Sequence, residues 1–430
     1  SDLTAEPGTF SLQQWTESGS GNYTVTIRPD GNTVRLIEGD YQGTDYSDEG
    51  LYRLDSVSRV CIDGRDPNNL SAGGRYLLFR NTNEDNFYYH STFNFIDGCH
   101  NDTLRNIIVE ANTEGVGVGV IRFGRHERGN YDILVDSCYI RSLTSDPTEH
   151  VRTGIYSYGV SSSETNHDIT ISNNHFINIW DDNGNDNHGI YVTGYSTDFT
   201  ITGNHFYLDA SRDMDANVSN YGIYINTEAY GVGDNFIVKD NYFGGSEPYC
   251  GGGPWTYTSG NHNIRYTGIK LETIDNSSGC IIENNKINNF EWYQYGYDDT
   301  PEENLIVFSG IQNVSGSSII RNNIIGAAEG TDSISLYCGP DQSLGSTDDN
   351  IGFIGIWVNR GEVVIDSNTI GAIKSYPSAF GTEKSPFQIE GIRISDTDCD
   401  GNDNTDDAVV RNNLIGSVKT ANSIETTAPC

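Results

Sequence analysis

Residues 171–176 read ISNNHF, and this order of apolar residue, polar corner and second apolar residue occurs eight times in the 430-residue chain. The copies are VDSCYI (135–140), ISNNHF (171–176), ITGNHF (201–206), VKDNYF (238–243), IENNKI (282–287), IRNNII (320–325), IDSNTI (365–370) and VRNNLI (410–415). Aligned on their fourth residue, they are separated by 36, 30, 37, 44, 38, 45 and 45 residues. A repeat of this period indicates a solenoid, a propeller or another array of stacked units.

Each copy predicts a short strand that ends at a sharp corner. Val or Ile opens every copy, and an apolar residue often stands two positions earlier, as at Ile133, Ile169 and Val363. This spacing indicates a strand with one buried face. The third residue is Asn, Asp, Ser or Gly, which tolerate the left-handed conformation that a corner needs. The fourth residue is Asn in seven copies and Cys138 in the first, so we expect stacked Asn side chains to form a ladder.

A second repeated segment lies between the corners and begins with Gly-Ile. Its seven copies are GIYSYG (154–159), GIYVTG (189–194), GIYINT (222–227), GIKLET (268–273), GIQNVS (310–315), GIWVNR (355–360) and GIRISD (391–396). These segments alternate with the last seven corners, so each repeat holds at least two strands and two turns. The expected fold is therefore all-β, a right-handed parallel β-helix with an Asn-rich corner ladder and about nine or ten coils. A propeller is the alternative, but its blades need four strands each and a rhythm of hairpins.

The repeats also predict the organisation of the chain. Residues 51–420 are expected to form the β-helix, and residues 421–430 a C-terminal tail. Residues 1–50 are expected to be an N-terminal lead-in or cap, with strands at 23–27 and 34–37 that lack the ladder. A cap is expected because the open end of a solenoid is an unpaired edge.

Composition narrows the classes of protein that the chain can belong to. Only 35% of the residues are hydrophobic and 48 are Gly, which suits the thin core of a solenoid. The net charge of −35 indicates a surface that repels nucleic acid and anionic membranes and disfavours acidic polysaccharides unless metal ions bridge the charges. No apolar run is long enough to span a membrane, so membrane insertion is not expected. The single methionine, Met214, is internal, so we expect a mature secreted form or an excised segment.

The cysteine count is even and suits an oxidising compartment. The eight residues are Cys61, Cys99, Cys138, Cys250, Cys280, Cys338, Cys399 and Cys430. Disulfide stabilisation is expected on this ground, although eight cysteines allow 105 pairings and the sequence does not select one. The alternative is that Cys138 and Cys280, at inward or corner positions, are buried thiols.

One acidic loop has the spacing of a calcium site. Residues 396–407 read DTDCDGNDNTDD, with acidic residues at loop positions 1, 3, 5 and 12 and Gly401 at position 6. Hard oxygen ligands at alternate positions can wrap Ca²⁺, and glycine permits the sharp turn. No flanking helices are expected, so the loop is not an EF-hand, and a solvated acidic turn is the alternative. The expected ligands are Asp396, Asp398, Asp400, Asp403 and Asp407.

Candidate catalytic residues form a weaker pattern. Asp181, Asp182 and His188-Gly189 resemble the paired Asp and His-Gly of polygalacturonase-type hydrolases, which need two carboxylates. Lys270 is a candidate lyase base. The spacing of Asp182 and His188 departs from the family pattern, and the family's Arg-Ile-Lys is missing. His175 and His205 occupy equivalent corner positions, either as a paired site or as polar stacking on the outside of a turn.

Aromatic residues in two long insertions suggest glycan binding. Rings on the face of a solenoid can stack on sugar rings, or they can pack a loop against the coils. The candidate residues are Trp255, Tyr257, Trp292, Tyr293 and Tyr295.

The repeat resembles the β-helix repeats of large cell-surface proteins that Bacteroidota secrete by the type 9 system. The matching segments are VCIDG (60–64), RYLLFRN (75–81), LRNII (104–108) and GVIRF (119–123), and the resemblance covers roughly residues 50–420. It implies an extracellular or cell-surface location and an adhesin or structural role. We therefore expect a non-catalytic surface module, stabilised by calcium and disulfides, whose partners are glycans, cell-surface components or other copies of itself. The alternatives are a secreted polysaccharide lyase or glycoside hydrolase and a subunit of an extracellular fibre.

Overall fold

The computed structural model consists almost entirely of short parallel strands, as the repeats predict. It describes residues 2–9, 11–19, 21–45, 49–83, 90–112, 115, 117–143, 151–181, 184–214, 218–259, 264–274, 279–294, 305–330, 332–338, 351–376, 388–395, 408–416 and 424–426. The chain divides into unit 1 (Ser1–Trp180, His188–Asn204 and Ile225–Ile237) and unit 2 (Asp181–Asn187, His205–Tyr224 and Val238–Cys430). Each strand is assigned below to the unit that holds most of its residues.

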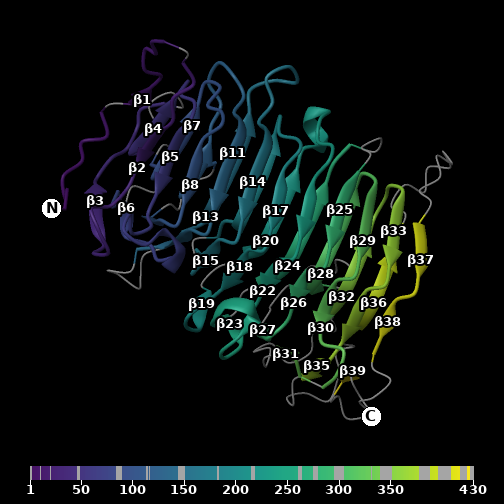
Figure 1. Cartoon of the computed structure of the whole chain (residues 1–430). Helices are drawn as coiled ribbons and strands as arrows, with labels where there is room; N and C mark the ends of the chain where they lie inside the picture. The colour runs from purple at the N-terminus through teal and green to yellow at the C-terminus, as the bar shows by residue number, and fades with distance from the viewer. Residues whose placement is uncertain are drawn as a thin grey trace. The chain divides into compact units, whose positions relative to one another are not determined.

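Unit 1 contains three parallel sheets, and every third strand in chain order joins the same sheet (Figure 1). Sheet 1 holds β1 (Ser11–Gln13), β4 (Tyr52–Asp55), β7 (Phe93–Ile96), β10 (Ile121–Phe123), β13 (Thr153–Gly159) and β16 (Asn187–Gly194). Sheet 2 holds β2 (Val25–Ile27), β5 (Val60–Asp63), β8 (Thr103–Arg105), β11 (Tyr131–Asp136), β14 (His167–Ser172) and β17 (Thr200–Thr202). Sheet 3 holds β3 (Arg35–Gly39), β6 (Leu77–Asn81), β9 (Ile108–Ala111), β12 (Tyr139–Ser142) and β15 (His175–Ile177).

Unit 2 repeats these three kinds of strand and adds a fourth sheet. Its sheet 1 strands are β20 (Val218–Asn226), β24 (Ile264–Glu272), β28 (Leu305–Ser315), β32 (Ile351–Val358) and β36 (Gln388–Ile394). Its sheet 2 strands are β21 (Ile237–Lys239), β25 (Cys280–Glu283), β29 (Ser318–Arg321), β33 (Val363–Asp366) and β37 (Ala408–Arg411). Its sheet 3 strands are β18 (His205–Tyr207), β22 (Tyr242–Phe243), β26 (Lys286–Ile287), β30 (Ile324–Gly326), β34 (Thr369–Gly371) and β38 (Leu414–Ile415). Sheet 4 holds β19 (Arg212–Met214), β23 (Trp255–Ser259), β27 (Phe290–Gln294), β31 (Ile334–Cys338), β35 (Ile373–Tyr376) and β39 (Ile424–Thr426).

These strands confirm the right-handed parallel β-helix. The Gly-Ile pair of each segment lies in a sheet 1 strand, and the corner copies join sheet 2 to sheet 3. Sheet 4 explains why repeats in unit 2 are longer than the 36 and 30 residues found in unit 1. The only helical elements in the described part of the chain are three short 3₁₀ turns, η1 (Leu70–Ala72), η2 (Glu228–Tyr230) and η3 (Pro248–Cys250). No helix of the described residues is long and apolar enough to cross a membrane.

The N-terminal 50 residues have the form of a coil. Their strands β1, β2 and β3 pair in parallel with β4, β5 and β6. With them, the described residues hold eleven strands of each of the first three kinds, against the nine or ten coils expected. The sequence concealed this coil because it lacks the Asn corner.

The corner ladder is confirmed in both units. The third residue of all eight copies has a positive φ, for example 56° at Asn284 and 55° at Asn322. In unit 2, the Oδ1 of Asn323 accepts hydrogen bonds from the backbone N–H and side-chain Nδ2 of Asn285, at 2.9 and 3.0 Å. The Nδ2 of Asn323 donates to the Ile282 carbonyl at 2.9 Å. Each buried Asn therefore satisfies backbone groups of the neighbouring coil, which would otherwise cost free energy.

The glycine of the Gly-Ile segments is required by close packing between coils. A Cβ atom on Gly310 would lie 2.6 Å from both the Gly355 carbonyl oxygen and the Cδ1 of Ile325. Since real Cβ atoms do not approach other atoms so closely, only glycine fits there. The following Ile311 is fully buried and contributes to the core.

Candidate functional site

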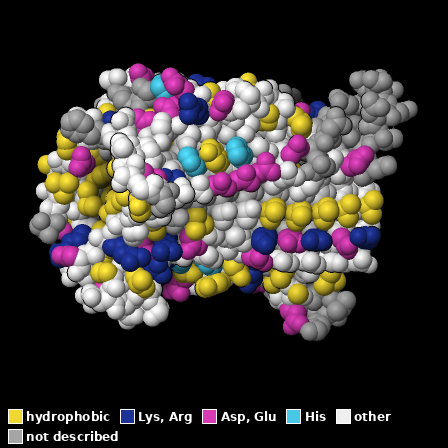
Figure 2. Space-filling model, turned by 45° about the horizontal axis from the view of Figure 1, so that its top comes forward, with side chains coloured by type: hydrophobic (Ala, Val, Ile, Leu, Met, Phe, Trp, Pro, Cys, Tyr) yellow, Lys and Arg dark blue, Asp and Glu magenta, His cyan; other side chains and the backbone are white. Residues whose placement is uncertain are grey.

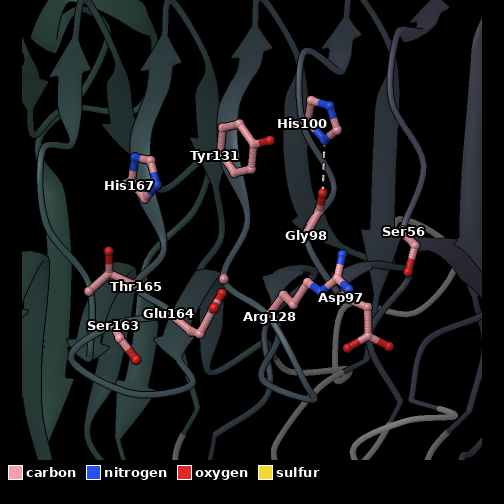
Figure 3. A pocket seen from close by; sticks show the side chains of 11 residues that line it. Ser56, Asp97, Gly98, His100, Arg128, Tyr131, Ser163, Glu164, Thr165 and His167 are labelled. Atoms are coloured by element: carbon pink, nitrogen blue, oxygen red, sulfur yellow. Dashed lines mark hydrogen bonds between the residues drawn. The ribbon is translucent and has the colours of Figure 1, made fainter.

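A groove of about 210 Å³ lies on the surface of unit 1, where three neighbouring coils enter sheet 2 (Figure 3). Three turns form it, each ending at a ring that lies at or just before a sheet 2 strand. The lining residues are Ser56, Asp97, Gly98, His100, Arg128, Gly129, Tyr131, Ser163, Glu164, Thr165 and His167. We call this feature the ring groove.

Three half-buried rings in register define the ring groove. The centroids of His100 and Tyr131 are 4.7 Å apart with an angle of 8° between the ring planes. Those of Tyr131 and His167 are 5.2 Å apart with an angle of 6°. Figure 3 shows the three rings in a row on neighbouring coils.

A second asparagine ladder holds these rings in register. The backbone N–H groups of Cys99 and Asn130 donate to the Oδ1 atoms of Asn130 and Asn166, at 3.2 and 2.8 Å. Each ladder residue directly precedes a ring, and the backbone N–H groups of Tyr131 and His167 each donate at 3.0 Å to the carbonyl of the ladder residue one coil before. The residue after each ring, Asn101, Asp132 or Asp168, has a positive φ. The backbone therefore places the rings one coil spacing apart.

The two imidazole rings present hydrogen-bond acceptors when they are neutral. The Nδ1 of His100 lies 2.9 Å from the Gly98 carbonyl oxygen, and the Nδ1 of His167 lies 2.9 Å from Oδ2 of Asp168. Because both partners only accept, each Nδ1 carries the proton, and each Nε2 is left as an acceptor. The Tyr131 hydroxyl between them can donate and accept.

Charged and hydroxyl groups complete the ring groove. Asp97 is held in place, because its carboxylate accepts a hydrogen bond from the backbone N–H of Glu127 at 2.6 Å and contacts Nδ1 of His126 at 2.7 Å. The hydrogen bond to Asp97 raises the pKa of His126. Figure 3 shows the Arg128 side chain extending toward Asp97, while Glu164 lies on the side of His167.

Two of the turns that line the groove pack closely against each other at Gly129. A Cβ atom on Gly129 would lie within 1.9 Å of the Thr165 carbonyl oxygen, so the turns approach more closely than any side chain permits. The stacked rings turn their edges to the groove, since His100 and His167 cover the two faces of Tyr131. Ring edges together with hydroxyl, imidazole, carboxylate and guanidinium groups can contact and hydrogen-bond to a polyhydroxylated ligand.

The sequence analysis did not find this groove, although a signal exists. The segments CHNDTL (99–104), NYDILV (130–135) and NHDITI (166–171) share a ladder residue, a ring and a polar residue. The first segment opens with Cys99 where the other two have Asn, and the shared pattern is short, so it is weaker than the corner pattern.

Three of the aromatic residues predicted to bind glycans are buried and do not form an exposed platform. Trp255, Tyr257 and Trp292 are 6%, 0% and 0% exposed, so their faces are closed to a sugar ring. They pack inside unit 2 with Tyr266 and Phe308, for example with 4.9 Å between the rings of Tyr257 and Trp292. This corrects the glycan-binding prediction for these three residues, because the insertions form sheet 4 and turn its apolar face inward.

The remaining two aromatic candidates do not form a platform with them. Tyr293 is half-buried and stacks on Tyr337 with 4.4 Å between ring centroids, and Tyr337 stacks on Tyr376 at 4.5 Å. Tyr295 lies outside the described residues.

The predicted calcium ligands Asp396, Asp398, Asp400, Asp403 and Asp407 all lie outside the described residues, so the calcium site stays a prediction. Within the described ranges, no group of three or more His, Cys, Asp and Glu residues could hold a metal ion.

The catalytic candidates that the structure describes are buried or are paired with neighbouring side chains. His188 is 4% exposed and its ring stacks on Tyr191 at 4.4 Å, in unit 1. Lys270 lies 2.6 Å from Glu272 and over the ring of Tyr224, in unit 2. Asp181 is fully buried, and Asp182 lies outside the described residues.

The two corner histidines also pack against rings. His175 contacts the ring of Tyr139 with 4.8 Å between centroids, in unit 1. His205 is 5% exposed and stacks on Tyr242 in unit 2, and burial lowers its pKa to about 4.

Five of the eight cysteines are described with their side chains, and all five are free thiols. Cys138 and Cys280 are buried, as one of the two interpretations predicted. Burial raises the pKa of Cys138 to about 12. The other free thiols are Cys61, Cys99 and Cys250. The side chain of Cys338 and the whole of Cys399 and Cys430 lie outside the described part of the chain.

Comparison of the chain with models of protein families, with curated proteins and with solved structures found no match.

Proposed function

We propose that this chain is an extracellular, non-catalytic glycan-binding module of the adhesin or surface-structural kind, which holds an uncharged glycan in the ring groove. The observation that carries the proposal is the row of His100, Tyr131 and His167, held in register at about one coil spacing. Ring edges beside fixed polar groups support this proposal, because a sugar offers both C–H groups for contact with the ring edges and hydroxyl groups for hydrogen bonds.

The repetition of the groove favours an extended glycan over a small ligand. Each coil contributes one turn and one ring, so a chain of similar units can meet similar contacts on successive coils. The charges of Asp97 and Glu164 outnumber that of Arg128 when the histidines are neutral. This balance suits a neutral glycan and disfavours an acidic one in the ring groove.

Binding is favoured over hydrolysis by the environment of the carboxylates. A glycoside hydrolase needs one carboxyl group as an acid and a second as a base or nucleophile across the scissile bond. Asp97 has its carboxylate engaged by His126 and Glu127. Glu164 is exposed, so it lacks the apolar surroundings that make a carboxyl group a general acid.

Calcium binding by the loop at 396–407 and an extracellular location remain part of the proposal on the sequence alone. They are consistent with the strongly acidic composition of the chain.

The test is a binding screen of neutral and charged oligosaccharides against wild type, Tyr131→Ala and His167→Ala. We expect a neutral oligosaccharide to bind wild type and Tyr131→Ala to weaken it about tenfold, because an anchoring ring contributes about 1.4 kcal/mol or more. Tyr293→Ala in unit 2 is the matched control and should bind as wild type does. The proposal is wrong if no neutral glycan binds, if both tyrosine variants lose binding equally, or if any glycan yields new reducing ends or unsaturated products.

A further inference from the structure

Arginine side chains gather on one surface of unit 1, although the chain as a whole carries a net charge of −35. Figure 2 shows Lys and Arg side chains concentrated in one area at the lower left of the view. The contacts described below define the arginine cluster, which consists of Arg28, Arg65, Arg75, Arg80, Arg105 and Arg141. Arg80, Arg105 and Arg141 lie on β6, β8 and β12. Arg28 directly follows β2, and Arg65 and Arg75 lie between β5 and β6.

The first half of the arginine cluster surrounds one buried carboxylate. Asp63, whose side chain is fully buried, contacts the guanidinium groups of Arg28, Arg65 and Arg105 at 3.2, 2.7 and 3.0 Å. Burial alone would raise the pKa of Asp63, but hydrogen bonds from Arg65 and the charge of Arg105 hold it at about 2. One carboxylate thus orients three guanidinium groups and can neutralise only one of them.

The second half has the same construction. The buried carboxylate of Glu110 lies 2.7 Å from the guanidinium groups of both Arg80 and Arg141. Arg80 also contacts Glu38 at 2.9 Å. Residues Glu38, Arg80, Glu110 and Arg141 are successive cross-strand neighbours in sheet 3, so their side chains lie on one face.

Arg75 has no carboxylate partner among the described residues. Its Nε donates to the Ser137 carbonyl at 2.7 Å, and its guanidinium group lies 3.7 Å from the centroid of the Tyr139 ring. Tyr139 is two residues before Arg141 on β12, so both side chains lie on the same face of the strand. Within the described ranges, the Nε–H is the one N–H group of Arg75 with a hydrogen-bond partner, which leaves the others to a ligand.

The charges in this area do not cancel. Five of the six guanidinium groups contact Asp63, Glu110 or Glu38, and Asp136 is the cross-strand neighbour of Arg105. Among these ten described groups, six positive and four negative charges leave an excess of two positive charges. The side chains of Arg28 and Arg105 are each 32% exposed, so their outer N–H groups reach solvent. In addition, the Nε of Arg105 is buried without a hydrogen-bond partner among the described residues.

We infer that the arginine cluster is a binding site for the anionic groups of an acidic glycan, carboxylate or sulfate, separate from the ring groove. Guanidinium groups bind such oxyanions through paired N–H donors, and Asp63 and Glu110 show that this arrangement accommodates carboxylates. Because buried carboxylates already fix the guanidinium groups, little side-chain entropy is lost when a ligand binds. The inference does not depend on the proposed function of the ring groove.

An acidic glycan fits this site better than a nucleic acid does. The net charge of −35 repels a densely charged backbone over its length, whereas an excess of two positive charges matches one or two anionic groups. The half-buried ring of Tyr139, next to Arg75, also offers apolar surface to a sugar.

The experiment measures binding of an oligogalacturonate, a sulfated oligosaccharide, a neutral oligosaccharide of equal length and a single-stranded oligonucleotide by calorimetry at two salt concentrations. The test variant is the double substitution Arg28→Gln with Arg75→Gln, which spares Arg65 and Arg105 on Asp63. The matched control is Arg321→Gln with Arg411→Gln, which removes two guanidinium groups from ion pairs on sheet 2 of unit 2. Circular dichroism and thermal midpoints check that both variants are folded.

We expect wild type to bind at least one of the two anionic oligosaccharides, and to bind it more weakly at higher salt. The test variant should lose at least tenfold in affinity, while the control variant should change less than twofold. The affinity ratio of the two anionic ligands identifies carboxylate or sulfate as the preferred group. The inference is overturned if neither anionic oligosaccharide binds, if test and control variants lose affinity equally, or if the oligonucleotide binds more tightly than both. Tyr131→Ala should leave this binding unchanged, which separates the two sites.

Discussion

Asp102 is a buried carboxyl group whose pKa departs from the ordinary value for aspartate. It is 1% exposed, and its Oδ1 accepts a hydrogen bond from the backbone N–H of Val60 at 2.8 Å. Burial raises its pKa from the ordinary value of 3.8 to about 7, although this hydrogen bond opposes the shift. Asp102 therefore stays protonated in the folded chain at pH values where it ionises in the unfolded chain.

The resulting pH dependence can be tested with Asp102→Asn. Between about pH 4 and pH 7, the unfolded state releases the proton while the folded state keeps it, so the contribution of Asp102 to stability is lost as the pH rises. Asn keeps an acceptor for the Val60 N–H and does not titrate. We expect the variant to gain stability relative to wild type as the pH rises from 4 to 8, by an amount on the order of 2–4 kcal/mol.

The measurement is the difference between the urea midpoints of the two proteins at each pH. In this difference, the contributions of other titrating groups, such as His205, to the pH dependence cancel. Parallel midpoint curves over this range would show that Asp102 ionises normally in the folded state.

The corner ladder links neighbouring strands of sheets 2 and 3, and it is the element that repeats most regularly. In unit 2 it runs from Asn241 through Asn285, Asn323 and Asn368 to Asn413, with hydrogen bonds of 2.9 to 3.0 Å at every step. Neighbouring residues have different roles here. Asn322 supplies a left-handed backbone conformation at an exposed position, whereas Asn323 supplies buried hydrogen bonds.

Substitutions at the two neighbours should separate these roles. Asn323→Ala leaves the buried backbone N–H of Asn285 and the Ile282 carbonyl without their partners, so we expect a loss of about 3 kcal/mol or more. Asn322→Gly keeps the conformation and should change stability by less than about 1 kcal/mol. Chemical denaturation of both variants checks this, and equal losses would mean that the backbone conformation, not the ladder, holds the corner.

At the scale of the whole molecule, two opposing electrostatic effects act on stability: repulsion from the net charge and attraction within local ion pairs. The net charge of −35 predicts general repulsion within the folded chain. Local pairs oppose it, such as Arg321 with Glu283 at 2.6 Å and Arg411 with Asp366 at 2.9 Å. Both arginine side chains are more than 40% exposed, and such exposed pairs contribute only about 0–1 kcal/mol each.

We therefore expect the thermal midpoint to rise when the NaCl concentration is raised from 10 mM to 500 mM, because screening weakens the general repulsion more than it weakens these pairs. Differential scanning calorimetry at constant pH measures this, with a non-electrolyte such as sucrose as the control for excluded volume. A fall in the midpoint would mean that surface ion pairs dominate the electrostatic free energy.

The sequence by itself determined the coil. Asn-rich corners, Gly-Ile strands and period-two apolar residues predict the β-helix, because each is a local requirement of backbone conformation or of burial that recurs on every coil. The same reasoning does not predict sheet 4, because its strands have no common motif and the sequence favours exposed insertions there. Burial of Trp292 depends on partners such as Tyr266 and Phe308, which are distant in sequence.

Only the tertiary structure placed the candidate sites. His100, Tyr131 and His167 are 31 and 36 residues apart in the sequence and become neighbours because coils stack in register. The arginine cluster likewise assembles from side chains on several coils around Asp63 and Glu110, against the sign of the net charge. Local sequence fixes which way each side chain leaves its strand, but which side chains meet across coils depends on loop lengths and register, and these are set when the whole core packs.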